Sequence, residues 1–448
     1  MGYVGSQFSA DKNTVTVSGT GSLWRTSVLH VGSYGAGNNL TITNGGQVVD
    51  GNGYVGTEDG ASNNVVTVTG IGSVWSNSNF LYVGSVGDAN SLTIINSGQV
   101  INIDGYVGYD YRANNNAVTV SGSGSVWHNN GTLAIGYGGT GGSLTITNNG
   151  AVTVAGNAYI SYNVSASNNI IIIDGGSLTV TNAAATGALT VRRGTLRLNS
   201  GTVTVDALIA NNIGAIVQFN GGVLNTRSSV VANAFVVGNG TDSATLNLLG
   251  GGQIFGNGLV ITNNAWLTGT GTISGSVLVN GSVQADTGSG LTFNGAITNN
   301  AVLRASNGAV IESWGPVVNN GVIDIIYGNT NFHSTFVNNG IVLTADGDPD
   351  GDGMTNLQES QAGTSPTNSV SCLRVTGVTS TSNDVCITWT AVGGKSYVVQ
   401  TNSTPGSGFA DFSPVIYVTG FGESVTNYVH TGGATNSSAL FYRVRLGP

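Results

Sequence analysis

The chain alternates apolar and polar residues in short runs that recur at a nearly constant interval. Each run places Val, Leu or Ile at every second position, with Thr or Ser between them. Runs of this kind, bounded by turns rich in Gly and Asn, predict short β-strands with one buried face. The predicted strands begin at Val15, Leu40, Val66, Leu92, Val118, Leu144 and Ile170.

The step from the start of one strand to the start of the next is nearly constant, at about 26 residues. A fixed period of short strands predicts a parallel β-solenoid, in which each turn, or coil, stacks on the one before. A β-propeller is the alternative, but its blades need antiparallel neighbours, whereas here like strands recur at each step. A second strand in each coil is marked by Val4, Val31, Val55, Val83, Val107 and Ile135.

The period shortens further along the chain. Turns that end in Asn follow one another at steps of about 16 to 20 residues. The last residues of these turns are Asn264, Asn280, Asn300, Asn320 and Asn339. We therefore predict an all-β chain with one parallel β-solenoid over residues 1–345. Its coils would hold about 26 residues over 1–195 and about 20 residues over 196–345.

The composition has a physical reason in this fold. Only 7% of the residues are charged, and 71 are Gly, whereas about 25% charged residues is usual. Like charges stacked on successive coils would repel, while Asn and Thr can hydrogen-bond to their own copies. With a net charge of −9 and a single small basic cluster at Arg192, Arg193 and Arg197, we expect no nucleic-acid binding. No apolar run is long enough to predict a membrane span.

The pattern changes at Asp346, where acidic residues crowd together. Counting from Asp348, carboxylates occupy positions 1, 3, 5 and 12, and Gly353 stands at position 6. This is the pattern of an EF-hand Ca²⁺ loop, in which position 7 supplies a backbone carbonyl. The alternative is a solvated acidic linker. We predict a structural Ca²⁺ site formed by Asp346, Asp348, Asp350, Asp352, Met354 and Glu359.

The same segment resembles the half EF-hand of dockerin and thrombospondin type 3 repeats. Those repeats continue into a Gly-Thr-Ser/Asp-Pro stretch, as Gly363–Pro366 does here. The resemblance implies that residues 346–368 form a calcium-binding loop and linker that the ion makes rigid. Two departures are Thr355, where an aliphatic residue is usual, and the lack of a predicted helix before the loop.

Residues 369–448 are predicted to form a small β-sandwich. About eighty residues with six strands suit a fibronectin type III-like or immunoglobulin-like module, and Trp389 is its candidate core aromatic. Cys372 and Cys386 are predicted to form a disulfide if the protein is secreted, and two buried thiols are the alternative. The predicted strands are Leu373–Val378, Val385–Trp389, Tyr397–Thr401, Val415–Thr419, Ser424–Val429 and Leu440–Leu446.

Catalytic chemistry has little support in the sequence, so we predict that the chain is not an enzyme. A polysaccharide-active β-helix enzyme needs clustered carboxylates with Arg or Lys on one face. The best local group is Asp104, Asp110 and Arg112. The four histidines share no spacing suited to a metal site or a triad; they are His30, His128, His333 and His430.

Two rows of aromatic residues recur at every second coil of the repeat. Stacked two coils apart, they could form platforms for sugars, or they could pack the core of the wide coils. The rows are Tyr3, Tyr54 and Tyr106, and Trp24, Trp75 and Trp127.

The repeat texture resembles that of bacterial secreted β-solenoid proteins, such as adhesins and autotransporter passenger regions. Residues 441–444 resemble the end of C-terminal modules in large bacterial secreted proteins. This implies an extracellular or cell-surface location. We expect a structural subunit of a surface or matrix fibre, because an uncapped solenoid end exposes strand edges that can pair with another copy head to tail. The alternatives are a carbohydrate-binding adhesin and, second, a polysaccharide-active enzyme.

Overall fold

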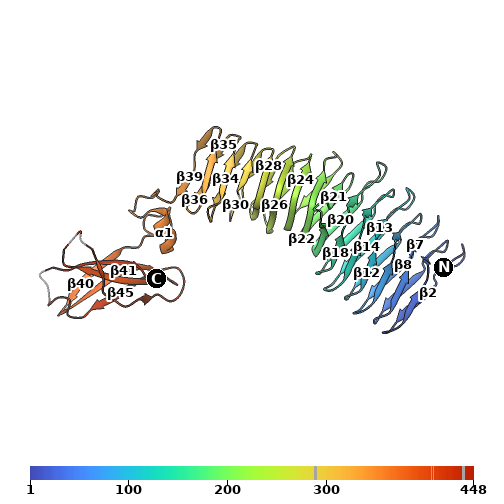
Figure 1. The fold of residues 1–448 in the computed structure, drawn as a ribbon, viewed down its shortest axis with the longest axis horizontal. Coiled ribbons are helices and arrows are strands. Elements are labelled where there is room, and N and C mark those ends of the chain that lie inside the picture. Colours follow the sequence, from blue (N-terminus) through green and yellow to red (C-terminus); the bar gives the residue numbers. More distant parts are fainter. Residues whose placement is uncertain (287–289, 405, 407, 436–438) are drawn as a thin grey trace. The chain divides into compact units, whose positions relative to one another are not determined.

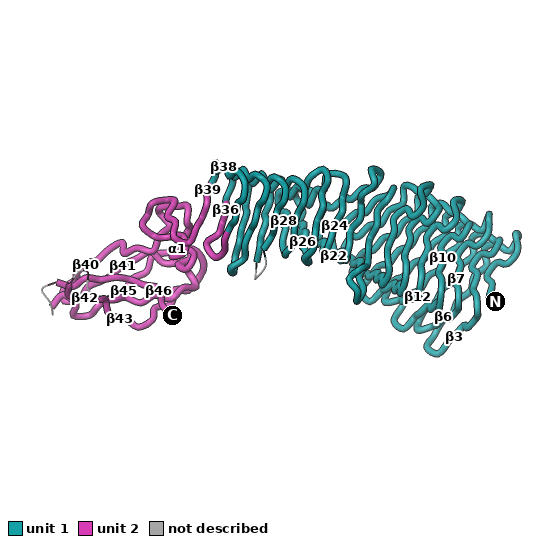
Figure 2. Tube along the Cα trace, turned by 45° about the horizontal axis from the view of Figure 1, so that its top comes forward, with its two compact units in different colours: residues 1–322, 330–340 teal, residues 323–329, 341–448 magenta. Residues whose placement is uncertain are grey.

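The computed structural model describes residues 1–286, 290–404, 406, 408–435 and 439–448 (Figure 1). About half of the chain is β-strand, at 52%, and only 2% is helical. The chain divides into two compact units (Figure 2). The first comprises Met1–Val322 and Thr330–Gly340, and the second comprises Ile323–Asn329 and Ile341–Pro448.

The predicted parallel β-solenoid is confirmed, with about 13 turns. Each wide coil contributes three strands, one more than the sequence pattern marked, and each of these strands pairs in parallel with the strand three places later. In the wide coils the first column of strands is β2 (Thr14–Ser18), β5 (Asn39–Thr43), β8 (Val65–Thr69), β11 (Ser91–Ile95), β14 (Ala117–Ser121) and β17 (Ser143–Thr147). The second is β3 (Leu23–Arg25), β6 (Gln47–Asp50), β9 (Val74–Asn77), β12 (Gln99–Asn102), β15 (Val126–Asn129) and β18 (Ala151–Val154).

The third column of the wide coils runs along another side of the solenoid. It consists of β1 (Gly2–Val4), β4 (Val28–Val31), β7 (Asn52–Val55), β10 (Phe80–Val83), β13 (Asp104–Val107), β16 (Leu133–Ile135), β19 (Ala158–Ile160) and β21 (Ala188–Val191). In the middle coils, single long strands span two columns or, in one case, all three. These long strands are β20 (Ile170–Val180), β22 (Thr195–Ala210), β24 (Gly222–Val231), β26 (Ala244–Phe255) and β28 (Ala265–Ser274).

The remaining coils are narrower, as the shorter sequence period predicted. Along the first column they continue as β23 (Ile216–Phe219), β25 (Phe235–Val237), β27 (Leu259–Ile261) and β29 (Val277–Val279). Three short strands per coil then return as β30 (Ser282–Ala285), β31 (Leu291–Phe293), β32 (Ile297–Asn299), β33 (Val302–Ala305), β34 (Val310–Ser313), β35 (Val317–Asn319), β36 (Val322–Ile325), β37 (Asn329–Phe332), β38 (Phe336–Asn338) and β39 (Ile341–Thr344).

Like residues stack on like residues because the register repeats from coil to coil. Thr41 pairs with Thr16 on one side and with Thr67 on the other. The inward positions next to them, such as Leu40 and Val66, are fully buried. This alternation gives the solenoid a thin apolar core and a polar outer face, as period-two strands require.

A buried asparagine ladder runs beside this core. The Asn38 side chain donates to Oδ1 of Asn64 at 3.0 Å, and Asn64 donates to Asn90 in the same way. The ladder lies so close to the turns that a Cβ atom on Gly32 would stand 2.2 Å from the Asn64 amide, and Gly32 has a φ of +74°. Glycine is therefore needed at this turn, and the ladder gives the buried side-chain amides of Asn38 and Asn64 their partners.

In the second unit, two small antiparallel sheets form the predicted β-sandwich. One sheet contains β40 (Val375–Thr381), β41 (Asp384–Val392) and β45 (Glu423–His430). The other contains β42 (Ser396–Asn402), β43 (Ala410–Asp411), β44 (Ile416–Tyr417) and β46 (Phe441–Leu446). The core includes Trp389, as predicted, together with Ile387, Tyr397 and Val399.

The predicted disulfide is wrong in this structure, because Cys372 and Cys386 are both free thiols. The Cys372 carbonyl accepts a hydrogen bond from Thr390 Oγ1 at 2.5 Å, which places Cys372 beside Thr390. Cys386 lies four residues earlier on β41, which is roughly 13 Å along a strand. A disulfide needs Cα atoms within about 7 Å of each other.

Candidate functional site

The acidic loop, residues 346–359, folds around three of its carboxylates. One oxygen each from Asp348, Asp350 and Asp352 lies within 4.8 Å of the other two. Asp348 accepts hydrogen bonds from the backbone N–H groups of Gly351 at 2.9 Å and Gly353 at 3.0 Å. These bonds curl the backbone so that the side chains at alternate positions converge.

Glu359 is the residue of this cluster whose surroundings a bound cation would change most. Its side chain is fully buried, and neither carboxylate oxygen has a hydrogen-bond partner among the described residues. Burial and the charges of Asp350, Asp352 and Asp348 raise the pKa of Glu359 to about 7. One oxygen each of Asp350 and Asp352 is also buried without a partner there. Buried carboxylates without partners are costly, and a bound cation would remove that cost.

The helix α1 (Asn356–Ala362) positions Glu359, and sequence reasoning missed it. Thr355 caps its start: Thr355 Oγ1 accepts from the Gln358 N–H at 3.3 Å, and Gln358 Oε1 accepts from the Thr355 N–H at 2.9 Å. Gly363 ends the helix with a φ of 81°. The Thr-x-x-Gln sequence followed by Gly was the available signal for this helix.

The donor set fits Ca²⁺, which prefers six to eight oxygen ligands. Asp348, Asp350, Asp352 and Glu359 would supply carboxylate oxygens, and Met354 would supply its backbone carbonyl as the loop pattern requires. The structure does not include Asp346 in the carboxylate cluster.

A second candidate site is a ladder of aromatic rings on the third strand column. Five rings stack nearly parallel, with centroid separations of 5.0, 4.9, 4.9 and 5.2 Å. They are Tyr3, His30, Tyr54, Tyr82 and Tyr106. Ala134 takes the next place in register, and a second stack of Tyr109, Tyr137 and Tyr162 continues beside it, at 4.8 and 4.6 Å. We call these eight rings the tyrosine ladder.

The ladder bears on the two alternatives for the tyrosine row, which are platforms for sugars and packing of the coils. His30 and Tyr82 cover the two faces of Tyr54, so a sugar cannot stack on this ring, whereas Tyr106 has one face covered, by Tyr82. Burial, helped by Asp104, raises the pKa of Tyr106 to about 12. Stacked rings of this kind stabilise the alignment of successive coils.

The tryptophan row belongs to the core. Trp75 and Trp127 are fully buried, and their indole N–H groups donate to Asp50 at 2.8 Å and Asn102 at 2.7 Å. Trp24 in the first coil is partly exposed. Of the two alternatives for this row, Trp75 and Trp127 therefore follow core packing, and they cannot contact a ligand.

The residues considered for catalysis are dispersed. Arg112 Nε contacts Asp110 Oδ1 at 2.9 Å, whereas Asp104 accepts from the Thr132 N–H at 2.5 Å. The four histidines each contact a different side chain: His30 contacts Thr57, His128 contacts Thr153, His333 contacts Glu312 and His430 contacts Tyr442.

No protein-family model matches this chain, and a search of curated proteins found no match. Within the described residues, no helix is both long enough and apolar enough to span a membrane. The fold and the geometry of these sites are therefore what supports a function.

Proposed function

We propose that the protein is an extracellular structural protein, a subunit of a surface or matrix fibre that assembles head to tail. The in-register solenoid supports this proposal, because the outer strand edges of a terminal coil can pair with another copy. The joint would form between the first coil of one copy and the C-terminal module of the next. Such a contact does not close on itself and so propagates into a filament.

The observation that carries the proposal is the exposure of core positions in the first coil. Val15, Val17 and Trp24 are partly exposed, whereas Val66, Val68 and Trp75 at the equivalent positions are fully buried. These first-coil residues line a hollow of about 720 Å³. Covering it with a second copy would remove apolar surface from water, worth about 25 cal/mol per Å².

The test compares two lysine substitutions at neighbouring residues. Val17→Lys places a charge on the core side of β2, and Thr16→Lys places one on its outer side. We expect sedimentation velocity to show concentration-dependent oligomers for the wild type and Thr16→Lys, and a monomer for Val17→Lys. Thermal unfolding of both variants checks that each remains folded. A wild type that stays monomeric at every concentration overturns the proposal.

We further propose that Ca²⁺ binds the acidic loop and makes it rigid, so that the fibre resists bending at this loop. The buried, unpartnered Glu359 supports the ion. The C-terminal β-sandwich, with its fibronectin type III-like character, would then act as the docking module.

Carbohydrate binding by a surface adhesin is the second candidate function. It does not rest on the aromatic rows. A polar hollow lined by Arg197, Asn199, Gln218 and Asn220 favours it.

A further inference from the structure

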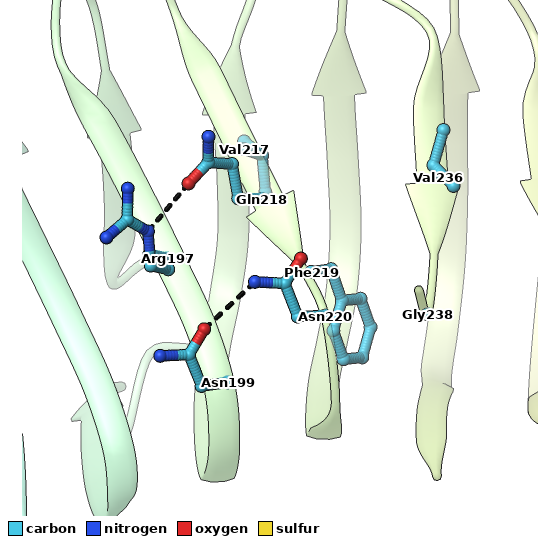
Figure 3. A pocket seen from close by; sticks show the side chains of 8 residues that line it. All are labelled: Arg197, Asn199, Val217, Gln218, Phe219, Asn220, Val236 and Gly238. Atoms are coloured by element: carbon cyan, nitrogen blue, oxygen red, sulfur yellow. Dashed lines mark hydrogen bonds between the residues drawn. The ribbon is translucent and has the colours of Figure 1, made fainter. Parts of the chain in front are cut away.

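The polar hollow lies where the solenoid changes from wide to narrow coils. It has a volume of about 510 Å³. Figure 3 shows Arg197 and Asn199 on β22 facing Gln218 and Asn220 on the next strand, β23, and the turn that follows it. Val217, Phe219, Val236 and Gly238 complete the lining, so among the described residues no carboxylate lines it.

The hydrogen bonds inside the hollow leave mainly donors free. Arg197 Nε donates to Gln218 Oε1 at 2.7 Å, and Asn220 Nδ2 donates to Asn199 Oδ1 at 2.9 Å (Figure 3). Among the residues that the structure describes, the two Nη groups of Arg197 and the amide N–H groups of Gln218 and Asn199 have no partner. A guanidinium with free N–H groups, flanked by amides, suits a carboxylate or sulfate.

The hollow also continues a column of hydroxyl groups. Arg197 pairs in register with Ile172, which pairs with Thr145. The six outward threonines of this column, one per coil, are Thr16, Thr41, Thr67, Thr93, Thr119 and Thr145. We call them the threonine column. Its hydroxyls repeat at about 4.8 Å, along the direction in which an extended chain molecule would reach Arg197.

We propose that the polar hollow binds an acidic sugar of an extended polysaccharide, and that the neighbouring sugars lie along the threonine column. Arg197 would pair with the carboxylate or sulfate. Gln218 and Asn199 would donate to sugar oxygens, and the half-exposed Val236 would contact the C–H face of the ring. This proposal rests on the carbohydrate-binding candidate and does not depend on fibre assembly.

The test uses isothermal titration of the full chain with three tetrasaccharides: a uronate, its neutral methyl ester and a sulfated one. The variants are Arg197→Gln and the matched control Arg193→Gln. Arg193 carries the same charge four residues away, is exposed, and donates to the Val164 carbonyl at 2.6 Å rather than into the hollow. Thermal unfolding confirms that each variant is folded.

We expect the wild type to bind at least one acidic tetrasaccharide about tenfold more tightly than the neutral one, the effect of one charge-assisted contact. Arg197→Gln should lose that preference, while Arg193→Gln should keep it. The stronger acidic ligand identifies the anion as carboxylate or sulfate.

The outcomes distinguish recognition of an acidic sugar from carbohydrate binding in general. Equal binding of acidic and neutral sugars, or equal losses in both variants, overturns the acidic site but leaves carbohydrate binding standing. If none of the three tetrasaccharides binds, both the acidic site and the carbohydrate-binding candidate are wrong.

Discussion

At the scale of single residues, two pairs of coils provide different side chains as the acceptor for a buried indole N–H. Trp75 donates its indole N–H to Asp50, and Trp127 donates to Asn102, which takes the equivalent position two coils later. Asn102 also donates to Asn129 at 2.6 Å, whereas one Asp50 oxygen is buried without a partner among the described residues. Burial raises the pKa of Asp50 to about 7, although the bond from Trp75 opposes the shift.

Asp50→Asn is therefore expected to stabilise the protein in a pH-dependent way. Below about pH 4 both the folded and unfolded wild type are protonated at Asp50, so the variant gains nothing from charge. As the pH rises towards 7, the folded wild type holds a proton that the unfolded chain releases, and its stability falls. Above pH 7 the gain should reach up to about 4 kcal/mol, given about 1.4 kcal/mol per pKa unit.

Thermal unfolding at pH 4 and pH 8 measures this difference. Asp59→Asn is the control, because the Asp59 side chain is 81% exposed and should give no such pH dependence. An Asp50→Asn variant that is no more stable than the wild type at pH 8 would show that Asp50 is ionised at little cost.

At the scale of elements, the acidic loop and α1 act together. Glu359→Gln is expected to lower Ca²⁺ affinity by at least about tenfold, because it removes a charge and a bidentate ligand from the loop. Calorimetric titration with Ca²⁺ measures the affinity. Glu58→Gln, at an exposed turn in the first unit, should leave it unchanged. Ca²⁺ binding that survives Glu359→Gln would mean that the three aspartates hold the ion alone.

Elements differed in how far the sequence could predict them. The strands of the first column, such as Val65–Thr69, follow from period-two alternation at a fixed interval. The second column was harder, because Val74–Asn77 contains a buried Trp and a buried Asn instead of alternating aliphatic residues. The helix α1 has only 7 residues, too few for a helical period to show.

The sites divide in the same way: a site whose residues are contiguous in sequence could be predicted, and a contact that depends on the register of the coils could not. The acidic loop was predictable because its ligands are contiguous in sequence. The stacking of His30 between Tyr3 and Tyr54 was not, because it depends on the register of three coils. The disulfide prediction failed for the corresponding reason, since only the strand positions decide how far apart two cysteines lie.

At the scale of the whole molecule, the two proposals on assembly and Ca²⁺ meet in one experiment. Negative-stain electron microscopy of the wild type with Ca²⁺ should show long filaments. Chelation should shorten or dissolve them if the acidic loop supports the joint. Filaments that persist after chelation would place the ion outside the assembly contact, and isolated rods under both conditions would contradict the fibre.

The repeated register also has a consequence for how such a protein can change over generations. The Gly-Tyr-Val-Gly sequence at Gly53 recurs at Gly105, and both glycines are followed by a ring of the tyrosine ladder. An in-frame deletion of residues 53–104 would join Asn52 to Gly105 and remove two whole coils while keeping every column aligned. Recombination between such repeats would lengthen or shorten the protein in steps of two coils, so its reach can evolve without a new fold.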